Sequence, residues 1–142
     1  MKKILENKEQ IIKYFEEGSK PKQLWQIGTE HEKFLYHLDT LKPIDYHGKK
    51  GIVSLFKLLK KKGWKEIIEN SNSIALKKKD STISLEPRCQ IELSGGKVKT
   101  IHQTCRQAKT YLDELKTICI KKKIGILGIG YYPINFKQNT GW

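Results

Sequence analysis

The apolar residues of the chain repeat with helical spacing in some segments and with strand spacing in others. Apolar side chains every three or four residues indicate a helix with one buried face, whereas strict alternation indicates a half-buried strand. Gly or Pro lies at or near the ends of most of these segments, as expected where an element stops. The pattern predicts helices over 4–15, 52–62 and 100–123, and strands over 24–36, 64–68, 73–76, 82–94 and 124–131.

The clearest alternation runs from Thr82 to Ser94. Apolar or soft residues occupy the odd positions and polar residues the even ones, so one face of the strand is core and the other is polar. Pro87 has no amide proton to donate to a neighbouring strand, which predicts a bulge or two strand segments at this point. The residues of the polar face are Ser84, Glu86, Arg88, Gln90, Glu92 and Ser94.

The last helix begins with a recognisable capping pattern. Thr100 and Gln103 form a capping box, in which each side chain bonds a free amide at the start of the helix. We expect Cys105 to lie on the buried stripe of this helix, and His102 to cap or pack. The glycine-bearing strand over 124–131 lacks the Gly-Lys-Ser/Thr ending of a phosphate loop, so its glycines indicate close backbone approach.

The chain is strongly basic, with 28 Lys and Arg against 15 Asp and Glu and a formal net charge of +13. Only Arg88 and Arg106 are arginine, whereas base recognition and bidentate phosphate binding favour arginine. The lysine runs at 60–62, 77–79 and 121–123 fall at predicted helix ends and in a turn, where a solvated surface is expected. A nucleic-acid partner is therefore not expected.

The cysteines and the apolar runs limit the cellular setting. Cys89, Cys105 and Cys119 are widely spaced, without the Cys-x-x-Cys pair of a zinc site or a redox dithiol, and we interpret them as reduced thiols. The apolar runs are too short to span a bilayer. Glu6 and Glu9 interrupt the first apolar segment, so no signal peptide is expected. We expect a cytoplasmic protein without a membrane partner.

Four glutamates are candidates for chemistry. Glu30 and Glu32 stand two apart in a predicted strand, so their carboxylates share a face, and such oxygens suit Mg²⁺. Glu86 and Glu92 share a face of a second predicted strand, with Gln90 between them. An ordinary solvated strand face is the alternative in both cases. Because both sets occur together in a lysine-rich chain, we favour carboxylates grouped around a divalent metal and phosphate, as ATP-dependent phosphoryl transfer requires.

Five short segments together resemble a known family: GTEHEKF at 28–34, SLEP at 84–87, QIELSG at 90–95, HQTC at 102–105 and GILGIG at 125–130. They are similar, in order and from about Lys20 to Pro133, to the amino-terminal part of glutamate–cysteine ligase of the plant and proteobacterial type. The resemblance implies an α+β fold of the glutamine-synthetase kind. In that fold a mostly antiparallel sheet forms an open funnel, with helices outside and metal-binding glutamates inside.

The resemblance also implies a reaction and its substrates. ATP phosphorylates the side-chain carboxylate of L-glutamate, and the amine of L-cysteine then displaces phosphate to give γ-glutamylcysteine, the first step of glutathione synthesis. A related carboxylate–amine ligase with another amine acceptor is an alternative within the enzyme class. A non-catalytic remnant or a small basic binding module is the alternative outside it.

The resemblance assigns roles to particular residues. Gln90 is a candidate to hydrogen-bond substrate, and Thr29 and Ser94 are candidates to orient the site. His31 falls on the opposite face of its strand and is expected to be structural. The implied Mg²⁺ ligands are Glu30, Glu32, Glu86 and Glu92.

The chain departs from the family in two places. Arg88 and Cys89 stand where the family usually has glycines, and a bulky cation there is expected to disturb the turn or the metal site. The chain ends at Trp142, and residues 135–142 do not resemble the family's continuation. We therefore expect residues 1–142 to be a truncated amino-terminal portion of a catalytic domain without a complete ATP site. Its unpaired sheet edges predict low solubility or self-association.

Overall fold

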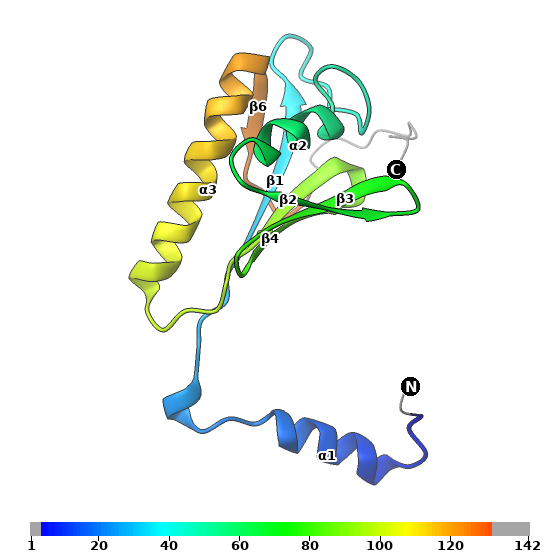
Figure 1. Ribbon diagram of the computed structural model, residues 1–142, viewed down its shortest axis with the longest axis vertical. Coiled ribbons are helices and arrows are strands. Elements are labelled where there is room, and N and C mark those ends of the chain that lie inside the picture. Colours follow the sequence, from blue (N-terminus) through cyan, green and yellow to red (C-terminus); the bar gives the residue numbers. More distant parts are fainter. Residues whose placement is uncertain (1–3, 132–142) are drawn as a thin grey trace.

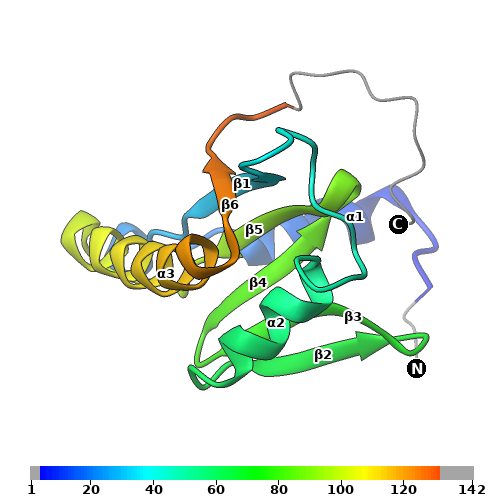
Figure 2. The same ribbon diagram turned by 90° about the horizontal axis from the view of Figure 1, so that it is seen from above.

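The computed structural model describes residues 4–131, which form a six-stranded sheet with helices (Figures 1 and 2). Short 3₁₀ turns occupy Lys22–Leu24 and Pro87–Cys89. The elements in chain order are α1 (Lys8–Gly18), β1 (Glu30–His37), α2 (Ile52–Lys60), β2 (Lys65–Glu69), β3 (Asn72–Lys78), β4 (Ser81–Glu86), β5 (Gln90–Ser94), α3 (Ile101–Lys122) and β6 (Ile124–Leu127).

The sheet has the strand order β2-β3-β4-β5-β1-β6, and each neighbouring pair is antiparallel. Strands β2 to β5 follow one another along the chain, and β1 is inserted between β5 and β6. The α+β class and the mostly antiparallel sheet are therefore confirmed. β1 links β6 to the rest of the sheet, because its first half pairs with β5 and its second half pairs with β6.

One face of the sheet carries the core, and α2 and α3 pack on that face (Figure 2). The apolar positions of α2 recur at helical spacing, so its buried side is continuous. On the sheet, buried residues of β4 and β5 alternate with half-buried polar ones, as predicted for 82–94. The side chains at the centre of this core include Ile52, Leu55, Phe56, Leu59, Leu76, Ile83, Ile91, Leu93 and Leu115.

The capping box of α3 is confirmed, since the Thr100 hydroxyl accepts from the Gln103 amide and the Gln103 side chain accepts from the Thr100 amide. The buried stripe of α3 differs from the prediction. Thr104 and Tyr111 are buried, and Cys105 is exposed. The expectation that Cys105 is core is wrong. The buried face of α3 is rotated by about one residue from the predicted one and includes Thr104 and Tyr111, whose polar groups did not indicate burial.

The predicted ends of three elements are corrected. Helix α1 begins at Lys8 because the Asn7 side chain accepts from the Gln10 amide and caps the helix there. Strand β1 begins at Glu30, six residues after the predicted start at Leu24, because Leu24 ends a 3₁₀ turn and Ile27 forms only an isolated bridge to Val98. Strand β6 ends at Leu127 and not at Tyr131.

Gly125 confirms the close backbone approach expected of the last strand. A Cβ placed on Gly125 would lie 2.1 Å from the ring of Tyr36, its partner in β1. Only glycine fits such a contact. Strand β6 can therefore lie flat against β1 while the Tyr36 ring crosses it.

Helix α1 stands apart from the sheet (Figure 1), and none of its residues is buried. Within residues 4–131, no helix is both long and apolar enough to cross a membrane. The predicted departure at 135–142 lies outside the described residues.

Candidate functional site

The strand register brings acidic side chains together on the face of the sheet opposite α2 and α3. Glu32 of β1 lies directly across from Glu92 of β5, and Glu30 lies across from Ser94. On the other side of β5, Ser84 of β4 faces Glu92. Directly opposed residues have Cβ atoms about 4.5–5.5 Å apart, so the carboxylates of Glu32 and Glu92 are neighbours.

The fourth glutamate lies further along the same face. Glu86 of β4 pairs with Gln90 of β5, and this pair lies two residues along the strands from the Ser84–Glu92 pair. Strand rise and strand spacing place the Cα atoms of Glu30 and Glu86 roughly 16 Å apart. The four predicted ligands therefore share a face but do not surround one point, with Glu32 and Glu92 at the centre, Glu30 at one end and Glu86 at the other.

No three side chains of His, Cys, Asp or Glu gather into a ready metal cluster within residues 4–131. Mg²⁺ does not need such a cluster, because it is commonly held by one or two carboxylates together with substrate phosphates and water. Oxygen ligands from Glu32 and Glu92 meet that description, and the residues present fit the ion in this respect.

The four glutamates of the acidic face have no close ion-pair partner in residues 4–131, although Lys33 attracts Glu32 electrostatically. The ion pairs found among the described residues involve none of the four glutamates, although the chain has a net charge of +13. Like charges directly opposite each other on neighbouring strands are destabilising. The Glu32–Glu92 pair therefore favours a cation between its two carboxylates.

One of the two central carboxylates is held in place by a neighbour. The Ser94 hydroxyl donates to Oε1 of Glu92 at 2.9 Å. This contact holds the carboxylate of Glu92 in one orientation. Thr29 lies elsewhere, because a Cβ on Gly95 would sit 3.1 Å from the Thr29 hydroxyl and 2.9 Å from Oε1 of Gln107 on α3. The hydroxyl of Thr29 is therefore on the helix side of the sheet.

The residues beside Glu32 in β1 face the covered side. His31 pairs with Leu93 of the core face, and its Nε2 atom is buried without a hydrogen bond within the described part of the chain. Lys33 donates from Nζ to the backbone carbonyl of Glu32 at 2.8 Å, and burial lowers the pKa of its amine. These positions agree with the predicted alternation, which leaves the acidic face to Glu30 and Glu32.

The turn between β4 and β5 accommodates Arg88 and Cys89 in an unusual conformation. Their φ angles are 62° and 58°, in the left-handed region that favours glycine. The pairing of the two strands nevertheless continues up to Glu86 and Gln90, which flank the turn. In the turn itself, the departure from glycine appears as backbone strain at Arg88 and Cys89.

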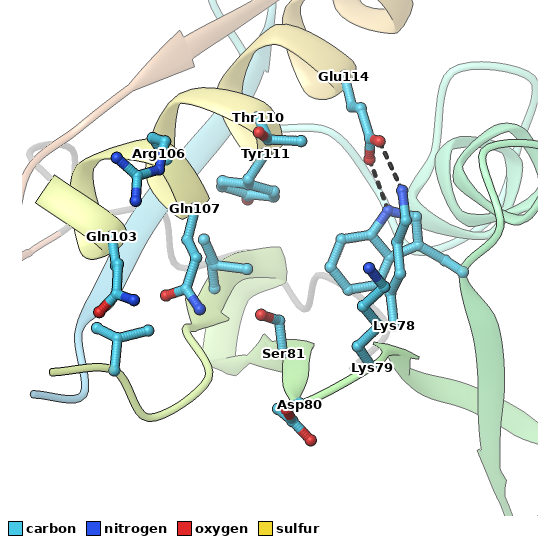
Figure 3. A pocket seen from close by; sticks show the side chains of 13 residues that line it. Lys78, Lys79, Asp80, Ser81, Gln103, Arg106, Gln107, Thr110, Tyr111 and Glu114 are labelled. Carbon is cyan, nitrogen blue, oxygen red and sulfur yellow. Dashed lines mark hydrogen bonds and ion pairs between the residues drawn. The ribbon is translucent and has the colours of Figure 1, made fainter. Parts of the chain in front are cut away.

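A second feature, which sequence reasoning missed, is a cavity of about 400 Å³ on the helix side of the sheet (Figure 3). Its lining comes from α3, from the turn between β3 and β4 and the strand ends beside it, and from the single residues Trp64, Leu93 and Val98. The run of lysines at 77–79 marks the turn, but no sequence signal places α3 against it.

Comparison with known proteins identifies relatives that match most of the chain. The profile of Glutamate-cysteine ligase family 2 matches residues 26–141. Glutamate–cysteine ligase A of rice is 44% identical over 126 residues, which are 89% of this chain and 25% of the rice protein. The glutamate–cysteine ligases of tobacco and Arabidopsis are 39% and 38% identical over 127 and 130 residues, 89% of this chain and 24% of each relative. The chain spans about a quarter of the length of these relatives.

Two expectations are corrected by the comparison. The family match continues to residue 141, so the prediction that residues 135–142 depart from the family is wrong. The relatives from rice, tobacco and Arabidopsis are named chloroplastic, which contradicts the expected cytoplasmic location.

Proposed function

This chain belongs to Glutamate-cysteine ligase family 2, and from that premise we propose that it contributes the metal-binding sheet of an enzyme that joins L-glutamate to L-cysteine with the use of ATP. The single observation that carries the proposal is the opposed pair Glu32 and Glu92, which lies on an open sheet face without an ion-pair partner in residues 4–131.

The proposed metal ligands divide according to their spacing. Glu32 and Glu92 would hold one Mg²⁺ ion, and Glu30 lies two residues along β1 on the same face. Glu86 is too far from Glu30 to share that ion and serves the other end of the site beside Gln90. When bound, Mg²⁺ neutralises negative charge on the phosphates of ATP and on the carboxylate of glutamate.

The reaction that this face supports has two transfers. The side-chain carboxylate of glutamate attacks the γ-phosphorus of ATP, so that an acyl phosphate forms and ADP leaves. The amine of cysteine then attacks the acyl carbon, an amide bond forms and phosphate leaves with the electron pair of the broken C–O bond. The chain's own contribution is positional, because Ser94 holds the Glu92 carboxylate at 2.9 Å and Gln90 offers an amide to substrate.

A glutamine substitution at Glu32 tests the proposal, because it removes one charge and keeps the shape. The assay is glutamate-dependent phosphate release from ATP, with and without cysteine, on the longest natural species that contains this sequence. We expect Glu32→Gln to lower kcat by roughly 100-fold, the effect of losing about 2.7 kcal/mol of charge stabilisation.

Glu69→Gln is the matched control. Glu69 is an exposed glutamate of β2, at the other edge of the sheet, and is expected to leave the rate within about twofold. A Glu32→Gln enzyme as fast as the Glu69→Gln enzyme would remove the proposal. Stimulation by an amine other than cysteine, with the same Glu32 dependence, would retain the metal site and change the acceptor.

A further inference from the structure

Strand β2 is the last strand on its side of the sheet (Figure 2). It pairs with β3 along one side, and no strand of residues 4–131 pairs with its other side. Its sequence is KEIIE, in which Ile67 and Ile68 are 38% and 62% exposed. An exposed edge with adjacent apolar residues is a template for a further strand.

The turn that joins β2 to β3 determines which backbone groups of β2 point outward. Asn70 and Ser71 have left-handed φ angles of 46° and 66°, as in a two-residue hairpin turn, so Glu69 beside them is hydrogen-bonded to β3. The amide and carbonyl groups alternate in direction along a strand. The register shift in this strand pair inserts its additional residue in β3, so the alternation continues along β2. The backbone groups of Ile68 and Glu66 therefore point away from β3.

The charged side chains of β2 are divided between the two faces of the sheet. Glu66 pairs with a buried core residue of β3, so it faces the helices, where Lys60 of α2 binds its carboxylate. Lys65 and Glu69 therefore lie on the open face, and neither takes part in the ion pairs among the described residues. Lys65 also lies directly across from Lys77 of β3, and like charges opposed in this way are destabilising. An acidic group at the outer side of Lys65 would offset that repulsion.

We propose that β2 pairs with β2 of a second copy of this chain, antiparallel and about a two-fold axis at Ile67, so that the two sheets become continuous. In this register Lys65 of each copy lies opposite Glu69 of the other copy. Glu66 of each copy lies opposite Ile68 of the other, and their outward amide and carbonyl groups bond across the axis. The exposed side chains of the two Ile67 residues meet at the centre.

The backbone and the charges together favour this register. An axis between two residues opposes outward groups to groups that face β3, so the ladder cannot form. An axis at Glu66 places two like charges directly across from each other. An axis at Ile68 leaves Lys65 without an opposite charge. A ladder of five residues is a small interface, so we expect a transient dimer that forms at roughly 0.1 mM.

Sedimentation velocity of the 142-residue chain tests the pairing at about 10 to 500 μM in 0.15 M salt, which screens the net charge of +13 beyond about 8 Å. We expect reversible, concentration-dependent conversion of monomer to dimer. Lys65→Glu and Glu69→Lys each place like charges at both crossings of the axis, so each is expected to weaken association at least tenfold. Lys116→Glu, at an exposed position of α3, is the matched control for charge reversal and is expected to associate as wild type does.

A mixture of the two edge variants tests the symmetry of the pairing. Each variant repels its own copies, whereas a mixed dimer of Lys65→Glu with Glu69→Lys has opposite charges at both crossings. We expect the mixture to recover the association of the wild type. Ile68→Pro tests the main-chain ladder, because proline removes an outward amide without loss of a bond to β3. This variant is expected to stay monomeric with an unchanged circular dichroism spectrum.

Three results would overturn the proposal. The first is a chain that stays monomeric up to about 500 μM. The second is association that persists in Ile68→Pro, which would place the contact at another surface, such as the exposed apolar residues of α1. The third is a mixture of the edge variants that associates no better than either variant alone. Because β3 and β4 separate β2 from β5, the pairing leaves the acidic face uncovered, and the two proposals fail independently.

Discussion

Arg88→Gly is expected to stabilise the protein, although it removes a whole side chain. Arg88 lies in the turn between β4 and β5 with φ 62° and ψ 33°. Its side chain is exposed and makes none of the ion pairs found within the described residues. The substitution therefore relieves backbone strain without loss of packing.

The magnitude follows from two opposing terms. The left-handed conformation costs a residue with a Cβ roughly 1–2 kcal/mol, and glycine does not have this cost. Glycine gives the unfolded chain additional freedom, which offsets about 0.5–1 kcal/mol of the gain. The expected net stabilisation is about 0.5–1 kcal/mol, or a rise in Tm of roughly 1–4 °C for a domain of this size. Cys89→Gly is not expected to give this gain, because Cys89 is 1% exposed and its side chain fills part of the core.

Urea denaturation monitored by circular dichroism measures the effect, with Arg106→Gly as the matched control. Arg106 is the other arginine of the chain and lies exposed within α3, where glycine is expected to cost about 1 kcal/mol. The same substitution should therefore have opposite signs at the two positions. If Arg88→Gly destabilises the chain as much as Arg106→Gly does, the assignment of strain to this turn is refuted.

The remaining predictions concern thiol reactivity and acid stability. Burial raises the pKa of Cys89 to about 11 and that of Cys119 to about 12, whereas Cys105 is exposed. Mass spectrometry after iodoacetamide treatment at pH 8 should show one rapidly modified thiol in the native chain and three in urea, and rapid native modification of all three would contradict the fold. The hydrogen bond from Lys60 holds the pKa of Glu66 below its ordinary value of 4.5. This contact therefore stabilises the fold above pH 4.5, and its contribution disappears as the pH falls through the lowered pKa. The difference in unfolding free energy between wild type and Glu66→Gln should therefore shrink between pH 6 and about pH 3, and a difference that is constant with pH would exclude this linkage.

Much of the fold follows from local patterns, and the errors have physical causes. Alternation over 82–94 and the capping box at Thr100 are local signals, and both are confirmed. The start of β1 could not be found in this way. Residues 24–29 are apolar enough for a strand, but Ile27 forms only an isolated bridge to Val98, so no neighbouring strand extends the ladder. Cys105 was misplaced because hydropathy does not indicate that Thr104 and Tyr111 face the core.

The sequence indicates which glutamates share a strand face, but not which of them lie opposite each other across the sheet. Because alternate residues of a strand lie on the same face, Glu30 shares a face with Glu32, and Glu86 shares a face with Glu92. The opposition of Glu32 and Glu92 depends on the register between β1 and β5, which are separated in sequence by three other strands and α2. The cavity beside α3 depends on contacts between five separate segments and has no local signal.

The central claim is that the Glu32–Glu92 pair binds a divalent metal, and paramagnetic line broadening by Mn²⁺, used in place of Mg²⁺, tests it most directly. We predict that substoichiometric Mn²⁺ broadens the amide signals of Glu32, Glu92 and Ser94 in the ¹⁵N-labelled chain before those of α3. This broadening should be lost in Glu92→Gln and retained in Glu69→Gln. Broadening that is centred elsewhere, or that is unchanged in Glu92→Gln, would contradict the account.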